Sequence, residues 1–136
     1  MRKTGNKMLE LKSRTVLVNQ PAEALYDHLM DLQNLYALMP ESVERFEADE
    51  DTFLFGLKGL PDVRLRKEKL ERPHLIEFKS ASSKMDFTLR CHLAEENEKT
   101  HLHFSFEGHF NPMVRMLAEK PLQNFLGALA EQAENL

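Results

Sequence analysis

Residues 16–26 have the sequence Val-Leu-Val-Asn-Gln-Pro-Ala-Glu-Ala-Leu-Tyr, which changes from an extended to a helical pattern within a few positions. The β-branched residues are typical of a strand end, and Pro21 suits the first position of a helix, where a backbone N–H has no partner. We therefore expect a strand over Met8–Val18, followed directly by an amphipathic helix. A second, short helix over Leu32–Leu38 should end before Pro40, which disfavours helical backbone at the preceding residue.

Between Val43 and Phe110 the hydrophobic period changes from helical to alternating, and turn-forming clusters divide the segment into about six strands. The connections are short, so antiparallel pairing is expected. Alternation is clearest in residues 86–93 and 101–110, which predicts one apolar and one polar sheet face. The predicted apolar set is Phe87, Leu89, Cys91, Leu93, Leu102, Phe104, Phe106 and Phe110.

A long C-terminal helix is predicted over Pro112–Leu136, because Asn111 is a good cap and Pro112 suits the first helical position. At 100° per residue its apolar stripe comprises Val114, Ala118, Leu122, Phe125, Leu129, Ala133 and Leu136. The sheet can bury its apolar face by curling around this stripe. The predicted fold is therefore α+β, with a curved antiparallel sheet of about seven strands around the C-terminal helix and two short helices after the first strand.

Composition limits the possible functions of the chain. Its 136 residues are 42% hydrophobic, enough for a single core, and we expect one domain over residues 8–136 with a flexible N-terminus at 1–7. A formal charge of -4 argues against nucleic acid as a partner. No apolar run approaches the roughly 20 residues of a transmembrane helix. Cys91 is the single cysteine and cannot form an internal disulfide, so a cytoplasmic protein is expected.

The order of the predicted elements resembles the START-related helix-grip superfamily (SRPBCC type). The resemblance rests on Pro-Ala-Glu-Ala-Leu-Tyr at 21–26, Asp-Leu-Gln-Asn-Leu at 31–35 and Leu-Met-Pro at 38–40. Known relatives include lipid-transfer domains, polyketide cyclases and dehydrases, plant hydrophobe carriers and chaperone-ATPase activators. The resemblance implies a hydrophobic cavity between the sheet and the C-terminal helix. Candidate cavity residues are Phe53, Phe55, Phe78, Phe87, Leu89, Phe104, Phe106, Val114, Ala118, Leu122 and Phe125.

Three functions remain open on the sequence alone. The favoured hypothesis is binding or transport of a small hydrophobic molecule without a cofactor, since nine phenylalanines and seven methionines suit an adaptable apolar pocket, although they also suit an ordinary core. A cyclase or dehydrase would need a titratable group facing the cavity, and the heavily charged segment Val63–Leu70 is where one could lie. The third hypothesis is a module that binds a protein partner, or a homodimer.

The chain offers little catalytic or metal-binding chemistry. On the two clearest strands every titratable side chain except Cys91 falls on the polar face, and burial would raise the pKa of that thiol. His92, His101, His103 and His109 share the polar face and could hold zinc or copper. No cysteine or carboxylate shell accompanies them, so a solvated strand face is the better interpretation. We therefore predict no catalytic residue and no metal ligand.

Overall fold

The computed structural model describes residues 8–81 and 86–136. An eight-stranded antiparallel sheet accounts for most of it, together with two α-helices and one short helix. The predicted flexibility of residues 1–7 lies outside the described residues. The elements are β1 (Met8–Lys12), β2 (Val16–Val18), α1 (Ala22–Met30), η1 (Leu32–Leu38), β3 (Val43–Ala48), β4 (Thr52–Leu57), β5 (Val63–Glu71), β6 (Leu75–Ser80), β7 (Phe87–Glu96), β8 (Lys99–His109) and α2 (Pro112–Ala133).

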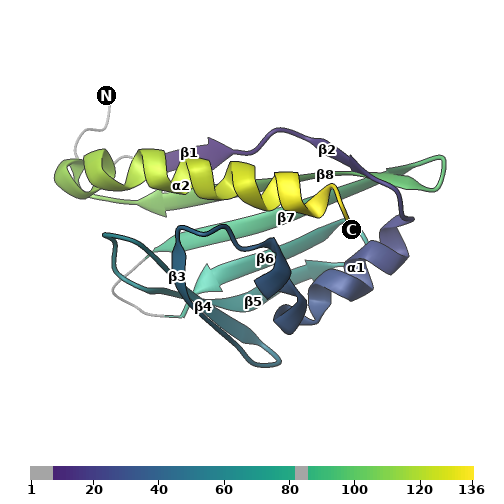
Figure 1. Cartoon of the computed structure of the whole chain (residues 1–136), viewed down its shortest axis with the longest axis horizontal. Helices are drawn as coiled ribbons and strands as arrows, with labels where there is room; N and C mark the ends of the chain where they lie inside the picture. Colours follow the sequence, from purple (N-terminus) through teal and green to yellow (C-terminus); the bar gives the residue numbers. More distant parts are fainter. Residues whose placement is uncertain (1–7, 82–85) are drawn as a thin grey trace.

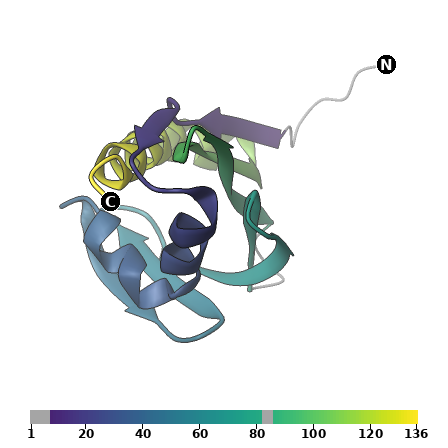
Figure 2. The same cartoon turned by 90° about the vertical axis from the view of Figure 1, so that its right-hand side faces the viewer.

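The strand order is β1-β8-β7-β6-β5-β4-β3, with β2 also paired to β8. From β3 to β8 each strand pairs with its neighbour in the chain, as short connections require. Figure 1 shows α2 lying along the sheet, and Figure 2 shows the strands curving around the interior. The helix packs on β1, β2, β8 and η1. This arrangement confirms the predicted fold class.

The N-terminal strand predicted over Met8–Val18 is two strands, which is a correction to the sequence interpretation. Lys12 pairs with Ser105 and Val16 with Leu102, so one side of the ladder carries an extra residue. Ser13 lies at the break. Its backbone N–H donates to the Phe104 carbonyl and its hydroxyl accepts from the Phe104 N–H, both at 2.9 Å. A tertiary contact, not a change of hydrophobic pattern, therefore divides the strand.

The helices begin at or within one residue of the predicted positions, with three differences in detail. Pro21 has extended backbone and precedes the first helix, so α1 begins at Ala22. The short helix Leu32–Leu38 has 3₁₀ geometry, and the Asp31 carboxylate accepts a hydrogen bond from the Gln33 N–H at its start. Asn111 caps α2 by accepting from the Val114 N–H at 2.9 Å, as predicted. The α-helix ends at Ala133 instead of Leu136. No helix in the described ranges is both long and apolar enough to cross a membrane.

The predicted faces of β7 and β8 are confirmed. Cross-strand partners share a sheet face, and Leu89 opposite Phe106 and Cys91 opposite Phe104 are all buried. The charged strand β5 can now be assigned as well. Its Val63 and Leu65 are buried. Its arginines Arg64 and Arg66 are exposed, and Lys67 lies opposite Phe78 and is half-buried.

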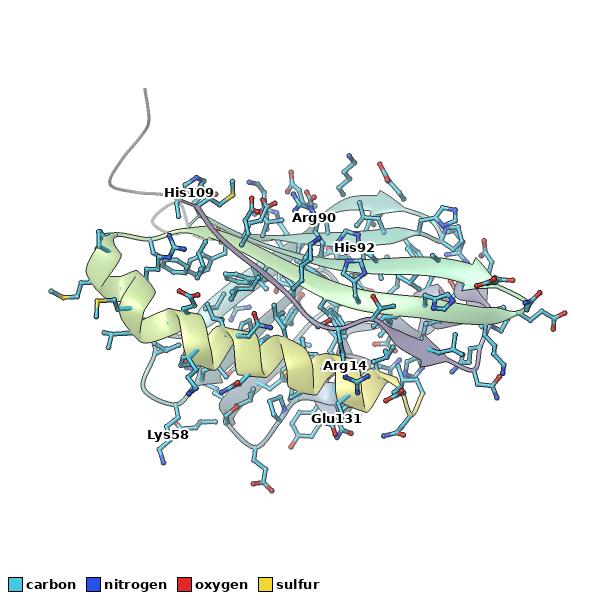
Figure 3. The ribbon with its side chains drawn as sticks, turned by 90° about the horizontal axis from the view of Figure 1, so that it is seen from above. Arg14, Lys58, Arg90, His92, His109 and Glu131 are labelled. Atoms are coloured by element: carbon cyan, nitrogen blue, oxygen red, sulfur yellow. The ribbon has the colours of Figure 1, made fainter. Side chains whose placement is uncertain are left out.

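Polar side chains form a connected group on the sheet face that points away from α2 (Figure 3). Arg90 donates to Glu77 at 2.8 Å and to Glu107 at 2.9 Å, and these hydrogen bonds raise the pKa of its guanidinium. Beside it the imidazoles of His92 and His103 stack with centroids 4.3 Å apart and planes within 4°. Partial burial lowers the pKa of both imidazoles, with Lys12 adding to the effect in each.

Replacing Phe104 with Ala should lower the free energy of unfolding by about 3–5 kcal/mol, because the ring is buried on the inner face of β8. His101→Ala, on the polar face of the same strand, should change it by less than about 0.5 kcal/mol. Urea unfolding at neutral pH measures both values. Equal losses from the two variants would contradict the assignment of the faces.

Stability should fall as the pH is lowered from 7.5 to 5.5. Both imidazoles have a lowered pKa in the folded protein. As the pH falls through the ordinary histidine pKa of about 6.5, the unfolded chain therefore takes up protons at these positions before the folded protein does, and unfolding becomes more favourable. The free energy of unfolding continues to fall until the pH is below the pKa that the two imidazoles have in the folded protein. Urea midpoints across this range should vary less for the double variant His92→Gln and His103→Gln. An unaltered slope in the double variant would contradict this origin.

Candidate functional site

A cavity of about 300 Å³ lies between the sheet and the first half of α2 and opens to solvent at one end of the molecule. Its walls come from β4, the β4–β5 turn, the start of β7, the end of β8 and α2. The lining residues are Phe55, Leu57, Leu60, Pro61, Val63, Phe87, Phe106, His109, Phe110, Asn111, Val114, Ala118 and Leu122. Nearly all of these side chains are apolar, so the interior suits an apolar molecule.

Three phenylalanine rings form one wall of the cavity because Gly108 leaves room for them. Phe87 lies 5.0 Å from Phe110 and 5.5 Å from Phe106, measured between ring centroids. A Cβ atom at Gly108 would lie 2.9 Å from the Phe110 ring and 3.0 Å from the Phe87 ring. Any larger residue at this position would therefore displace the aromatic wall.

The two polar side chains of the lining already have partners. Asn111 caps α2, as described above. His109 Nδ1 lies 2.8 Å from Asp86 Oδ2, and its side chain is on the polar face of β8, away from α2 (Figure 3). Because both side chains already have partners within the protein, the cavity would recognise a ligand by shape and apolar contact. It offers few groups for acid–base catalysis.

A pair of stacked rings closes the inner end of the cavity. Phe55 of β4 and Phe125 of α2 have centroids 4.5 Å apart and planes within 9°. Phe55 lines the large cavity, whereas Phe125 lines a second void of only about 20 Å³ on the other side. The interior therefore has an open half and a filled half, separated by the Phe55–Phe125 stack.

The predicted cavity residues divide between these two halves. The large cavity brings together Phe55, Phe87, Phe106, Val114, Ala118 and Leu122. The small void is lined by the others, Phe53, Phe78, Leu89, Phe104 and Phe125. Val114 is 39% exposed despite its place in the predicted stripe, because it faces the open cavity. Leu126 and Ala130 are buried outside that stripe, since α2 is also covered by η1.

Sequence reasoning missed several lining residues. Phe110 continues the inward alternation of β8 and could have been added on that ground. Leu60 and Pro61 lie in a turn, where an apolar pair is an available signal of a nearby cavity. Gly108 left no signal in the sequence, because its role depends on three rings that approach it only in the folded chain.

The residues considered for catalysis or metal binding do not converge. Cys91 is buried, and desolvation raises the pKa of its thiol far above the ordinary range. His101 binds Glu96 and His109 binds Asp86, which leaves only His92 and His103 in contact with each other. Within residues 8–81 and 86–136, no three His, Cys, Asp or Glu side chains are grouped to hold a metal ion.

Solved structures share this architecture along almost the whole chain. A protein from Thermus thermophilus aligns with a TM-score of 0.68 at 18% identity, covering 93% of this chain and 94% of that one. Truncated norcoclaurine synthase from Thalictrum flavum gives 0.67 at 12% identity, covering 98% and 96%. This chain has the helix-grip fold. The Zhui aromatase/cyclase from Streptomyces sp. R1128 gives 0.66 at 16% identity, covering 94% of each chain.

These structures thus confirm the fold that the resemblance to the START-related superfamily predicted. No family model and no curated protein sequence matches the chain. At these identities the helix-grip likeness concerns the backbone, and any function must be argued from the cavity itself.

Removing the Phe125 ring should join the two halves of the helix-grip interior. Phe125→Ala should cost about 3–5 kcal/mol of unfolding free energy, and the enlarged apolar space should admit benzene. Benzene should therefore raise the melting temperature of Phe125→Ala more than that of the wild type. Phe46→Ala, which removes a half-buried ring that lines neither space, serves as the control. An equal benzene response in both variants would contradict the dividing role of the stack.

Proposed function

We propose that the protein binds a small hydrophobic molecule in the cavity between its sheet and α2. The observation that carries this proposal is an open space of about 300 Å³ with an almost wholly apolar lining. A core that served packing alone would be filled to close-packed density, as the opposite end of this interior is. Each methylene group that a ligand buries there would contribute about 0.8 kcal/mol to binding.

The lining favours an uncharged ligand or an uncharged portion of one. Burying a charge without a partner is costly, and the lining offers no Lys, Arg, Asp or Glu among the described residues. The volume lies at the lower end of the range for ligand pockets, which is about 300–1,000 Å³. A molecule of one or two rings, or a short alkyl chain, would fit the space on this side of the Phe55–Phe125 stack.

Two structural neighbours are named as a synthase and an aromatase/cyclase, and one norcoclaurine synthase structure holds dopamine and hydroxybenzaldehyde. These names support an organic ligand for a cavity in this fold. They do not favour the same chemistry here, because His109 and Asn111 are the polar lining side chains and both are already engaged. We therefore propose a binding or transport role. Native mass spectrometry of gently purified protein tests it through a co-purifying small molecule.

Ala118→Phe should separate a ligand cavity from a poorly filled core. Ala118 lines the cavity from α2, so a phenyl ring there would occupy the open space. Stability should be unchanged or higher, and uptake of the uncharged fluorescent probe N-phenyl-1-naphthylamine should be lost. Thermal unfolding and probe titration of both proteins measure the two effects.

Asn124→Phe is the matched control, since it adds the same ring on an exposed face of the same helix. It should leave probe uptake at the wild-type level. If Ala118→Phe instead destabilises by about 1–3 kcal/mol and the wild type takes up no probe, the space is already filled by its neighbours and the proposal fails.

A further inference from the structure

The first turns of α2 carry an exposed apolar surface, which we call the α2 ridge and define as Met113, Met116 and Leu117. Their exposed fractions are 73%, 83% and 65%. Residues three and four positions apart lie on one face of a helix, so the three side chains are neighbours. From Ala118 to Ala133 the same helix buries its large apolar side chains. Solvent-facing Met and Leu side chains grouped in this way mark an interaction surface.

The α2 ridge adjoins the mouth of the cavity. Val114, next to Met113 in the chain, lines the cavity and is also partly exposed. Apolar surface therefore continues from the interior, across the mouth, to the outside of the helix. An occupant of the ridge would stand directly at the opening through which a ligand enters or leaves.

The area of the ridge limits what can cover it. A stable protein dimer buries about 800 Å² on each partner, which three side chains on one helix do not supply. Binding to a lipid surface does not require so large an area. A few apolar side chains inserted at the level of the headgroups are enough for binding when basic residues lie beside them.

Basic residues lie at this end of the molecule. Lys120 is three positions after Leu117, on the ridge side of α2. Lys58 extends into solvent from the β4–β5 turn, whose Leu60 and Pro61 line the mouth (Figure 3). Neither lysine takes part in an ion pair among the described residues. The mouth therefore presents positive charge on two sides.

The acidic turns lie at the other end. Antiparallel strands alternate their turns between the two ends of a sheet. The β3–β4 turn carries Asp49, Glu50 and Asp51, at the opposite end of β4 from the cavity residue Leu57. The β7–β8 turn, with Glu96 and Glu98 beside it, lies far from the start of α2 in Figure 1. Carboxylates near the mouth are paired instead: Asp62 with Arg45, Asp86 with His109 and Glu119 with Arg115.

We propose that the mouth end of the protein docks on an anionic lipid bilayer, with the α2 ridge inserted among the headgroups and Lys58 and Lys120 beside the lipid phosphates. The two lysines beside the ridge, unpaired among the described residues, attract the mouth toward such a surface. Docked in this way, the cavity opens onto the lipid instead of onto water. The docking goes beyond ligand binding and does not require a filled cavity.

Co-sedimentation with lipid vesicles tests the proposal on the full chain. Wild-type protein should bind vesicles of phosphatidylcholine mixed with phosphatidylglycerol, bind pure phosphatidylcholine much more weakly, and lose affinity as salt is raised. The double variant Met116→Glu and Leu117→Glu should bind the mixed vesicles at least about tenfold more weakly. Lys58→Ala and Lys120→Ala should each weaken binding about fivefold.

Leu70→Glu is the matched control for the ridge variants, since it places the same charge at a residue that is 45% exposed and lines neither interior space. It should keep wild-type vesicle binding. Ala118→Phe should lose probe uptake but still sediment with the mixed vesicles. That variant separates failure of docking from failure of the cavity proposal. Circular dichroism melts establish that each variant is folded.

Three results would overturn the docking proposal. The first is wild-type protein that stays in solution with both kinds of vesicle. The second is binding that survives Met116→Glu and Leu117→Glu unchanged. The third is a concentration-dependent dimer, detected by analytical ultracentrifugation and abolished by Met116→Glu, because the ridge would then be covered by a second copy of the chain.

Discussion

The stacked rings of Phe55 and Phe125 are the contact on which the interior of this molecule depends. They join β4, the strand next to the sheet edge at β3, to the middle of α2. On one side of them the aromatic and aliphatic side chains fill the space to within about 20 Å³, and on the other side about 300 Å³ stays open. Packing in the filled half holds α2 against the sheet. The first turns of α2 therefore do not need to pack on the sheet and can border a cavity.

Hydrophobic periodicity was sufficient to predict most elements of this fold and the faces of its clearest strands. The alternation of Leu102, Phe104 and Phe106 indicated the inner face of β8 directly, because every second residue of a strand shares a side. The start of α2 at Asn111 and Pro112 followed from capping chemistry. These features are local, so the sequence contains them.

Periodicity could not say where the interior is empty. Phe53 and Phe55 are two positions apart on one strand and equally buried, yet they line different spaces. Val114 and Leu122 belong to one predicted stripe, but only Val114 has an exposed side. Whether an inward side chain meets a neighbour or a cavity depends on residues far away in the chain. The break at Ser13 escaped prediction for the same reason, since its partner Phe104 is on β8.

The division of the interior also has an evolutionary consequence. Folding stability is concentrated in the filled half, where removal of a ring leaves a void that costs several kcal/mol. Around the mouth, residues such as Leu60, Val63 and Val114 border open space, so a change in their size alters the shape of the cavity. Selection can therefore act on the two halves almost independently. In a helix-grip protein of this kind, substitutions around the mouth can change which ligand binds, while the filled half maintains the fold.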